Sequence, residues 1–371
     1  MPETVDAIAQ SVVNDGVAPA VTVAVAVRLG RGWVIRSGGA GRIAGHGSGS
    51  VTRDTPFDLA SVSKSFVAAA LARLAHSGVL RWDLELGSVV EEARGTPSAR
   101  QNLEWLLAHR AGLEPHRPLY RPLVERRAFS AGRALGEAAR AVWVGRAAGK
   151  GPHQPRYSDL GYLLLGEAMV RCALQPLDQL IWQQVCSPLG LRVGSSRQWL
   201  AWDPDFLRSV APTERVAWRG GLLVGVVHDE NAWAYAGHAT AGHAGLFGSA
   251  AAVAGFGAAV LDVMTGRRDD WLDRAALAHL VAPRPGGTLR AGFDGVAPGA
   301  SAAGTLCGPR TFGHLGFTGT SFWCEPAVEC VTVLLTNRVN LGRHHLAIRE
   351  ARPLVHDRLH RLALEIRTEG W

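Results

Sequence analysis

Hydrophobic positions along the chain follow two different periods. The run AVTVAVAV (20–27) is short, apolar and rich in β-branched residues, and GWVIRSGGAG comes shortly after it. Together they predict two antiparallel strands, the second leading into a glycine-rich turn. From 61 to about 78 the period becomes helical, with Phe66 and Leu74 on the apolar face.

The same patterns organise the rest of the chain. Residues 80–245 show mostly helical patterns joined by loops rich in proline and glycine, whereas TSFWCEP and CVTVLLTN are short and typical of strands. The closing stretch is helical and predicted to break near Pro353. We therefore predict an α+β fold in which both ends of the chain share one antiparallel sheet flanked by helices, with an all-helical domain inserted. The predicted domains are 1–60 with 246–371 (sheet) and 61–245 (mostly helical), and any functional site is expected at their interface.

Composition narrows the class of protein. The 371 residues are 47% hydrophobic and 19% charged, which is ordinary for a globular protein with a sizeable core. No apolar run reaches the ~18 residues of a membrane span, so no membrane association is predicted. The net charge is +7, but the arginines are scattered, which argues against nucleic-acid binding.

Compartment signals are weak but consistent. The five cysteines are odd in number and lack CxxC spacing, which favours reduced, mostly buried thiols. The first residues contain acids and no basic segment followed by an apolar core, so a secretory signal is not predicted. These features predict a cytoplasmic protein, or a periplasmic one if a signal has been removed.

One lysine is unusual in this composition. Of 39 basic residues only Lys64 and Lys150 are lysines. Lys64 follows Ser61 by three residues at the start of the predicted helix, so the two side chains share a face. A serine there can simply be a helix cap. With Lys64 beside it, Ser61 is also a candidate nucleophile at a helix N-terminus, which favours negative charge.

The choice of lysine points to acid–base chemistry. A buried lysine can lose its proton and act as a base, whereas arginine effectively never does. A merely cationic position in this chain would be expected to carry arginine, although Lys150, in a predicted loop, shows that the preference has exceptions. A G-x-S-x-G nucleophile elbow is absent from the sequence.

The stretch FDLASVSK resembles a known family. SVSK is similar to the S-x-x-K motif of penicillin-binding proteins, class C β-lactamases and related serine esterases. The resemblance implies a Y-x-N motif downstream, and RYSDLGYLLLGEAM supplies Tyr157 and Asp159. It implies that Tyr157 lies beside Lys64 with a lowered pKa and relays protons. The alternative is a half-buried structural tyrosine. Asp159 replaces the usual Asn, so it is expected to pair with Lys64 or alter substrate contacts, and it argues against penicillin-like substrates.

A third motif of the resemblance is K-T-G or H-x-G on a strand. FGHLGFTGTSFWCEP supplies His314 and Gly316, which fit better than the overlapping FTG because Phe317 has no polar side chain. Gly316 would let substrate approach the backbone. The resemblance implies that the N–H groups of Phe317 and Ser61 form the oxyanion hole. It also implies that His314, in place of the usual lysine, orients substrate or assists proton transfer.

The resemblance extends over essentially the whole chain. LLAHRAGL, VHDENA and GHAGLF match segments of the penicillin-binding-protein-4-like and esterase-like branch. It implies a β-lactamase/transpeptidase-like fold. A metal site is a weaker interpretation of His228, Asp229, His238 and His243, because their spacings match no compact ligand motif. Structural or cleft-lining roles are preferred for them, and no metal or other cofactor is predicted.

The predicted function is a serine hydrolase that forms an acyl-enzyme with a Ser61–Lys64–Tyr157 set. Its predicted partner is a small-molecule acyl substrate, either a small ester or a D-amino-acid amide or peptide. D-alanyl-D-alanine carboxypeptidase or β-lactamase activity is the alternative, disfavoured by Asp159, His314 and the lack of an export signal. A non-catalytic binding protein on the same fold is the alternative from another class. The sequence gives no signal for an oligomeric state.

Overall fold

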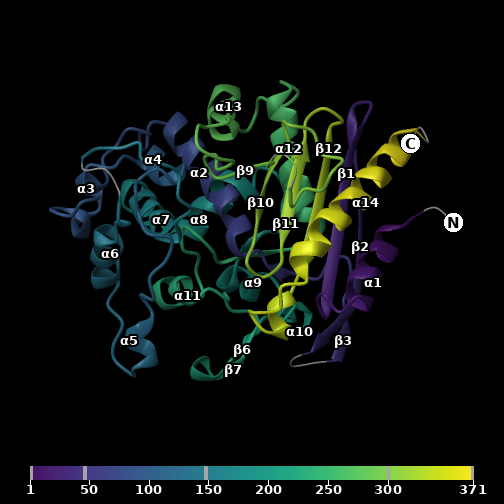
Figure 1. The fold of residues 1–371 in the computed structure, drawn as a ribbon, viewed down its shortest axis with the longest axis horizontal. Helices are drawn as coiled ribbons and strands as arrows, with labels where there is room; N and C mark the ends of the chain where they lie inside the picture. Colours follow the sequence, from purple (N-terminus) through teal and green to yellow (C-terminus); the bar gives the residue numbers. More distant parts are fainter. Residues whose placement is uncertain (1–2, 45–47, 146–148, 298, 300, 369–371) are drawn as a thin grey trace.

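The computed structural model describes residues 3–44, 48–145, 149–297, 299 and 301–368 (Figure 1). Its central feature is a seven-stranded antiparallel sheet in the order β3-β2-β1-β12-β11-β10-β9. The strands are β1 (Ala20–Leu29), β2 (Gly32–Ala44), β3 (Ser48–Ser50), β9 (Asp294–Gly295), β10 (Phe312–Leu315), β11 (Ser321–Glu325) and β12 (Cys330–Thr336). Strands from the two ends of the chain meet at its centre, where β1 pairs with β12. This confirms the predicted α+β class with a shared antiparallel sheet.

The alternation in AVTVAVAV decides what covers each face of β1. The valines at odd positions pack into a core with α1 (Val5–Asn14) and α14 (Ile348–Thr368), which lie on one face of the sheet (Figure 1). The alanines point to the other face, where α12 (Ala250–Met264) contacts β1 and β12. Small residues there let a helix approach closely, so β1 is buried on both faces.

The segment between the two halves of the sheet is mainly helical and lies to one side of it (Figure 1). Its helices are α2 (Ser63–His76), α3 (Leu86–Val89), α4 (Leu103–Leu107), α5 (Arg121–Val124), α6 (Ala131–Arg140), α7 (Asp159–Ala173), α8 (Leu177–Ile181), α9 (Ser196–Trp202), α10 (Phe206–Ser209) and α11 (Glu230–Ala236), and α13 (Arg274–Val281) follows α12. Single helical turns are η1 (Ala60–Val62), η2 (Glu91–Ala93), η3 (Trp182–Cys186, a π turn), η4 (Ala217–Arg219) and η5 (Arg338–Leu341). The exact domain boundaries stay a prediction.

The inserted segment is not all-helical, which corrects the sequence-based expectation. Short strands β5 (Gly194–Ser195), β6 (Arg215–Val216) and β7 (Gly221–Leu222) lie within it. β5 pairs with β8 (Leu246–Gly248), which also pairs with β4 (Phe57–Asp58). Two-residue strands carry no alternating pattern, because a strand signal needs about four residues or more.

Two further expectations were wrong. The glycines of GWVIRSGGAG do not form a turn but lie inside the 13-residue strand β2. Gly41 has φ +96°, and a Cβ there would lie 2.0 Å from the Pro19 carbonyl oxygen, so glycine is needed for a close approach within the sheet. The closing helix α14 is not broken, because Pro353 lies inside it. One lost helical hydrogen bond is offset by the apolar side that α14 buries on the sheet.

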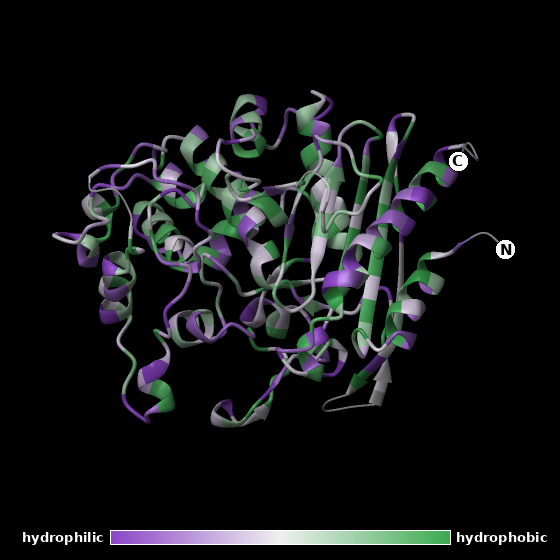
Figure 2. Ribbon diagram, viewed as in Figure 1, coloured by the Kyte–Doolittle hydropathy of each residue, from purple (hydrophilic) through white to green (hydrophobic). Residues whose placement is uncertain are grey.

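Hydropathy follows these layers (Figure 2). The central strands are largely hydrophobic, whereas α14 alternates between hydrophobic and hydrophilic residues, as expected for a helix with one face on the sheet. All five cysteines are free thiols, and three of them are buried. Among the described residues, no helix combines the length and apolarity that crossing a bilayer requires.

Gly41→Ala is expected to destabilise the protein by about 2–4 kcal/mol, because the added methyl group clashes with Pro19 in a strained backbone conformation. The matched control is Gly30→Ala, which also has positive φ but has no atom within 4 Å of the added Cβ. It is expected to cost only about 1 kcal/mol. Urea unfolding of both variants measures the difference, and equal losses would contradict the close-approach argument.

Candidate active site

Ser61 lies in η1, between β4 and α2, directly after a strained residue. Ala60 has φ +48°, a left-handed conformation that costs a non-glycine residue about 1–2 kcal/mol. Buried Asp58 accepts hydrogen bonds from the Ala60 N–H at 2.8 Å and the His228 N–H at 2.6 Å, which fixes this conformation. α2 begins at Ser63 with no side-chain cap, so Ser61 does not act as the cap of this helix.

Lys64 is fully buried, and its amine is surrounded by oxygen atoms. Nζ donates to Ser61 Oγ at 2.8 Å, Asp159 Oδ1 at 2.7 Å and the His243 carbonyl oxygen at 3.1 Å. Burial lowers the pKa of Lys64, while the negative charge of Asp159 opposes that shift. In the neutral amine two N–H groups remain for Asp159 and His243, which leaves the lone pair facing the Ser61 hydroxyl.

Asp159 is placed by the start of α7. Ser158 caps this helix, with Oγ accepting from the Gly161 N–H, and the Ser158 N–H donates to His109 Nδ1 at 3.0 Å. The Asp159 side chain is 23% exposed, so part of the carboxylate stays accessible while Oδ1 binds Lys64. The expected pairing of Asp159 with Lys64 is therefore present in the structure.

Tyr157 lies beside Lys64, but its pKa moves opposite to the expectation. The Lys64 amine is 4.8 Å from the centre of the Tyr157 ring. Burial and the negative charge of Asp159 raise the pKa of Tyr157 well above its ordinary value, and this outweighs a hydrogen bond with the Ser61 side chain that lowers it. The predicted lowered pKa of Tyr157 was wrong, because the resemblance did not account for the burial of the phenol or for the Asp159 carboxylate two residues away. Tyr157 therefore stays protonated and can act as a hydrogen-bond donor.

His314 projects from β10 toward the same site, with its ring centre 6.1 Å from that of Tyr157. Nδ1 donates to the Leu315 carbonyl oxygen at 2.7 Å, so in the neutral ring Nε2 is an acceptor. Burial, and then the charge of Lys64, lowers the pKa of His314 to about 3. His314 is thus neutral at physiological pH and does not supply the positive charge of the lysine it replaces in the resemblance.

The turn after β10 carries Gly316 and Phe317 and is bound to the segment before Ser61. Thr318 Oγ1 donates to the Asp58 carbonyl oxygen at 2.9 Å, and Thr320 Oγ1 donates to the Leu59 carbonyl oxygen at 3.0 Å. A Cβ on Gly316 would lie 1.9 Å from Thr320 Oγ1, so only glycine permits this approach. Within the described chain the Phe317 N–H donates to no other group, which leaves it free for an oxyanion.

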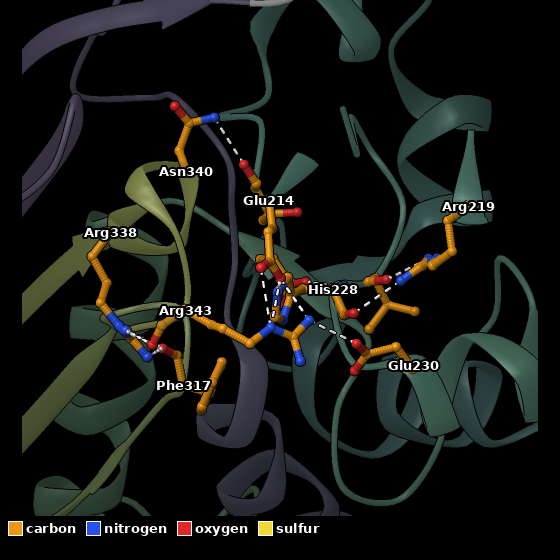
Figure 3. A network of polar contacts seen from close by, with 11 residues as sticks. Glu214, Arg219, His228, Glu230, Phe317, Arg338, Asn340 and Arg343 are labelled. Carbon is orange, nitrogen blue, oxygen red and sulfur yellow. Dashed lines mark hydrogen bonds and ion pairs between the residues drawn. The ribbon is translucent and has the colours of Figure 1, made fainter. Parts of the chain in front are cut away.

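The Phe317 side chain sits in a polar network that the sequence did not reveal (Figure 3). Its ring stacks on the His228 ring, with ring centres 5.7 Å apart. The Arg338 guanidinium also contacts the Phe317 ring and lies 4.7 Å from its centre. Glu214 bonds His228 Nε2 at 2.9 Å and pairs with Arg343 at 2.6 Å. Burial raises the pKa of Glu214, but His228 and Arg343 outweigh it and bring the pKa to about 2.

Of the four residues that sequence spacing offered as possible metal ligands, His243 and Asp229 contact each other, whereas His228 and His238 bond other side chains. His243 Nε2 pairs with Asp229 Oδ1 at 2.8 Å, His238 Nδ1 lies 3.0 Å from Ser196 Oγ, and His228 bonds Glu214. Structural or cleft-lining roles for these residues stay a prediction. His243 also supports Lys64 through its carbonyl oxygen.

Sequence reasoning missed some residues that shape the site. Asp58 and His109 stood within quoted stretches, FDLA and LLAHRAGL, but carried no assigned role. The His109 ring packs against the Tyr157 ring, with ring centres 4.6 Å apart, and His109 Nδ1 accepts a hydrogen bond from the Ser158 N–H. Arg338 also carried no assigned role.

Comparison with known proteins agrees with this geometry. A family model described as Beta-lactamase matches residues 5–356. The chain belongs to the beta-lactamase family. The match agrees with the resemblance to serine β-lactamases and penicillin-binding proteins that the sequence motifs carry.

Individual relatives are more distant. A putative D-alanyl-D-alanine carboxypeptidase of Escherichia coli (strain K12) is 29% identical over 202 residues, which cover 49% of this chain and 44% of that protein. The chain thus spans less than half the length of the curated relatives it matches. Solved structures with the same fold include EstCE1, a hydrolase with promiscuous acyltransferase activity (TM-score 0.68, 22% identity, 94% of this chain and 96% of that one). Another is the D-amino acid amidase from Ochrobactrum anthropi SV3 (TM-score 0.69, 18% identity, 96% and 98%).

Asp159→Asn is expected to shift the acidic limb of the kcat/KM–pH profile to lower pH. The carboxylate stabilises protonated Lys64, so its removal lowers the pKa of Lys64 further and the neutral base persists at lower pH. The profile is measured with a chromogenic ester that has no ionisable group. The matched control is Glu85→Gln, which removes the exposed carboxylate that pairs with Lys150 at 2.7 Å and is expected to leave the profile unchanged. An unmoved limb in Asp159→Asn would contradict the coupling.

Proposed function

We propose that this chain hydrolyses small esters or D-amino-acid amides through an acyl-enzyme on Ser61. The observation that carries the proposal is the 2.8 Å contact between Ser61 Oγ and the buried Lys64 amine. Burial favours the neutral amine, and a neutral amine at this distance can take the serine proton as the nucleophile attacks a carbonyl.

In the proposed acylation step the serine proton moves to Lys64 while the substrate oxygen gains negative charge toward the N–H groups of Ser61 and Phe317. Tyr157 then donates its proton to the leaving group. Because the pKa of Tyr157 is raised, a free phenolate is costly, so Lys64 returns a proton to Tyr157 in the same step. Deacylation reverses the path: Tyr157 and Lys64 accept the proton of the attacking water, and Ser61 recovers its own.

The charges near Ser61 determine which substrates we propose. The residues near Ser61 include the anionic Asp159 and the neutral His314, a poor combination for binding a substrate carboxylate. D-alanyl-D-alanine peptides and β-lactams carry such a carboxylate. We therefore rank them below esters and amides as substrates, although the curated relatives are named as putative D-alanyl-D-alanine carboxypeptidases. The accessible part of the Asp159 carboxylate is an acceptor that suits the ammonium group of a D-amino-acid amide.

A serine-reactive fluorophosphonate is expected to add once to the native chain and not to Ser61→Ala, as measured by intact-protein mass. Lys64→Arg is expected to keep the positive charge but to react at least about a hundredfold more slowly, because arginine cannot serve as a base. Lys150→Arg is the matched control and should react like the native chain.

Labelling that persists in Ser61→Ala, or an undiminished rate in Lys64→Arg, would contradict the mechanism. A well-folded native chain that takes no label would favour the non-catalytic binding protein instead. Hydrolysis of a β-lactam or a D-alanyl-D-alanine peptide faster than any ester or amide would overturn the substrate ranking alone.

Asp159 is expected to select acyl groups that carry a free amine. The test compares kcat/KM for D-alanine p-nitroanilide and its N-acetyl derivative, for which we expect a preference of about tenfold for the free amine. In Asp159→Asn this ratio should fall toward one. Taking the ratio within each enzyme cancels any effect of the substitution on Lys64. An unchanged ratio would show that Asp159 does not recognise the amine.

A further inference from the structure

Two arginines hold the backbone on either side of the Phe317 N–H. Arg352 Nη2 donates to the Gly316 carbonyl oxygen at 2.7 Å. Arg338 donates to the Phe317 carbonyl oxygen from Nη2 at 2.7 Å and from Nε at 3.0 Å (Figure 3). The Gly316 carbonyl and the Phe317 N–H belong to one peptide group, so Arg352 binds the opposite end of the group that faces the oxyanion.

Arg352 is a buried cation without a counter-charge. It lies near the start of α14 and is only 9% exposed, and among the described residues its side chain hydrogen-bonds only to backbone carbonyls. Burial lowers the pKa of Arg352 to about 10, and the charges of Arg338 and Arg349 lower it in the same direction. At neutral pH the guanidinium is therefore charged, and a charge buried without a partner costs stability.

The Gly316 and Thr320 carbonyls do not need Arg352 to complete their hydrogen bonds. The Gly316 carbonyl also accepts from the Gly319 N–H at 3.1 Å, and the Thr320 carbonyl, which Arg352 reaches at 3.3 Å, also accepts from the Gly316 N–H at 2.7 Å. Both carbonyls would remain bonded without Arg352. The turn is also held to the Ser61 segment by Thr318 and Thr320.

We propose that Arg352 is a positioning residue for the oxyanion hole, where its guanidinium polarises the Gly316–Phe317 peptide and so strengthens the Phe317 N–H as a donor. A hydrogen bond to a carbonyl strengthens the donor at the other end of the same peptide, and charge fixed before reaction needs no reorganisation. The missing counter-charge is supplied only when the oxyanion forms. This inference rests on the proposed function, because it requires an oxyanion at Phe317.

The test is Arg352→Met, with Arg349→Met as the matched control. Arg349 lies three residues earlier on α14, is exposed and makes no bond to the turn, so its removal deletes the same charge at a nearby position without touching the peptide. We expect kcat for an ester to fall about tenfold in Arg352→Met with KM within twofold, and Arg349→Met to stay within twofold of the native enzyme. Arg352→Lys, which keeps a cation, should recover part of the loss.

Melting temperature separates positioning from simple structural support. Because Arg352→Met removes an unpaired buried charge and leaves both carbonyls bonded, its melting temperature is expected to equal or exceed that of the native chain. An unchanged kcat in Arg352→Met, a loss of kcat matched in Arg349→Met, or failure of Arg352→Met to fold would each overturn the proposal. Ser61→Ala is measured in parallel. Activity that survives in Ser61→Ala contradicts the proposed function itself, whereas Ser61-dependent activity with a normal Arg352→Met contradicts only the role of Arg352.

Discussion

The Lys64 amine lies between oxygens of Ser61, Asp159 and His243 and has no contact with solvent. Burial penalises the charged amine, and the nearby carboxylate partly restores it, so the balance of these two effects sets how readily Lys64 accepts a proton. The rest of the site holds this arrangement. Ser61 in η1 and Lys64 in the first turn of α2 lie side by side. The N-terminus of α7 brings Asp159 to them, and the loop before β8 supplies the carbonyl of His243.

Charge is distributed unequally around Ser61. Asp159 and Asp229 act on Lys64, and both raise its affinity for a proton. Arg338 and Arg352 instead bind the peptides that flank Phe317. These charges therefore favour a reaction that moves a proton toward Lys64 and negative charge toward the Phe317 N–H. The central sheet makes the layout possible, because β10 ends at Leu315 and the turn that follows it is bonded to the strained segment that precedes Ser61.

The sequence predicted most of the sheet and the three motifs, because these depend on local patterns. The apolar, β-branched run at 20–27 predicted β1, and S-x-x-K, Tyr157 and His314 came from motifs with fixed spacing. What it missed depends on distant contacts. Burial in the fold and the charge of Asp159 raise the pKa of Tyr157. Gly41 lies in a strand, not a turn, at a point where the Pro19 carbonyl leaves no room for a Cβ, and no local pattern shows that contact. Arg338 and Arg352 bind backbone carbonyls, which any segment of sequence can supply, so no motif marks them.

The most direct test of this account is the protonation of Lys64 itself. The chain has only two lysines, so a protein labelled with ¹³C at lysine Cε gives two signals, which Lys150→Arg assigns. Titration of the Lys64 signal against pH reports the pKa of its amine. The account predicts a value below the ~10.4 of an ordinary lysine, and a lower one still in Asp159→Asn. A Lys64 signal that titrates at or above the ordinary value would show that the amine remains charged, and it would contradict Lys64 as the base that activates Ser61.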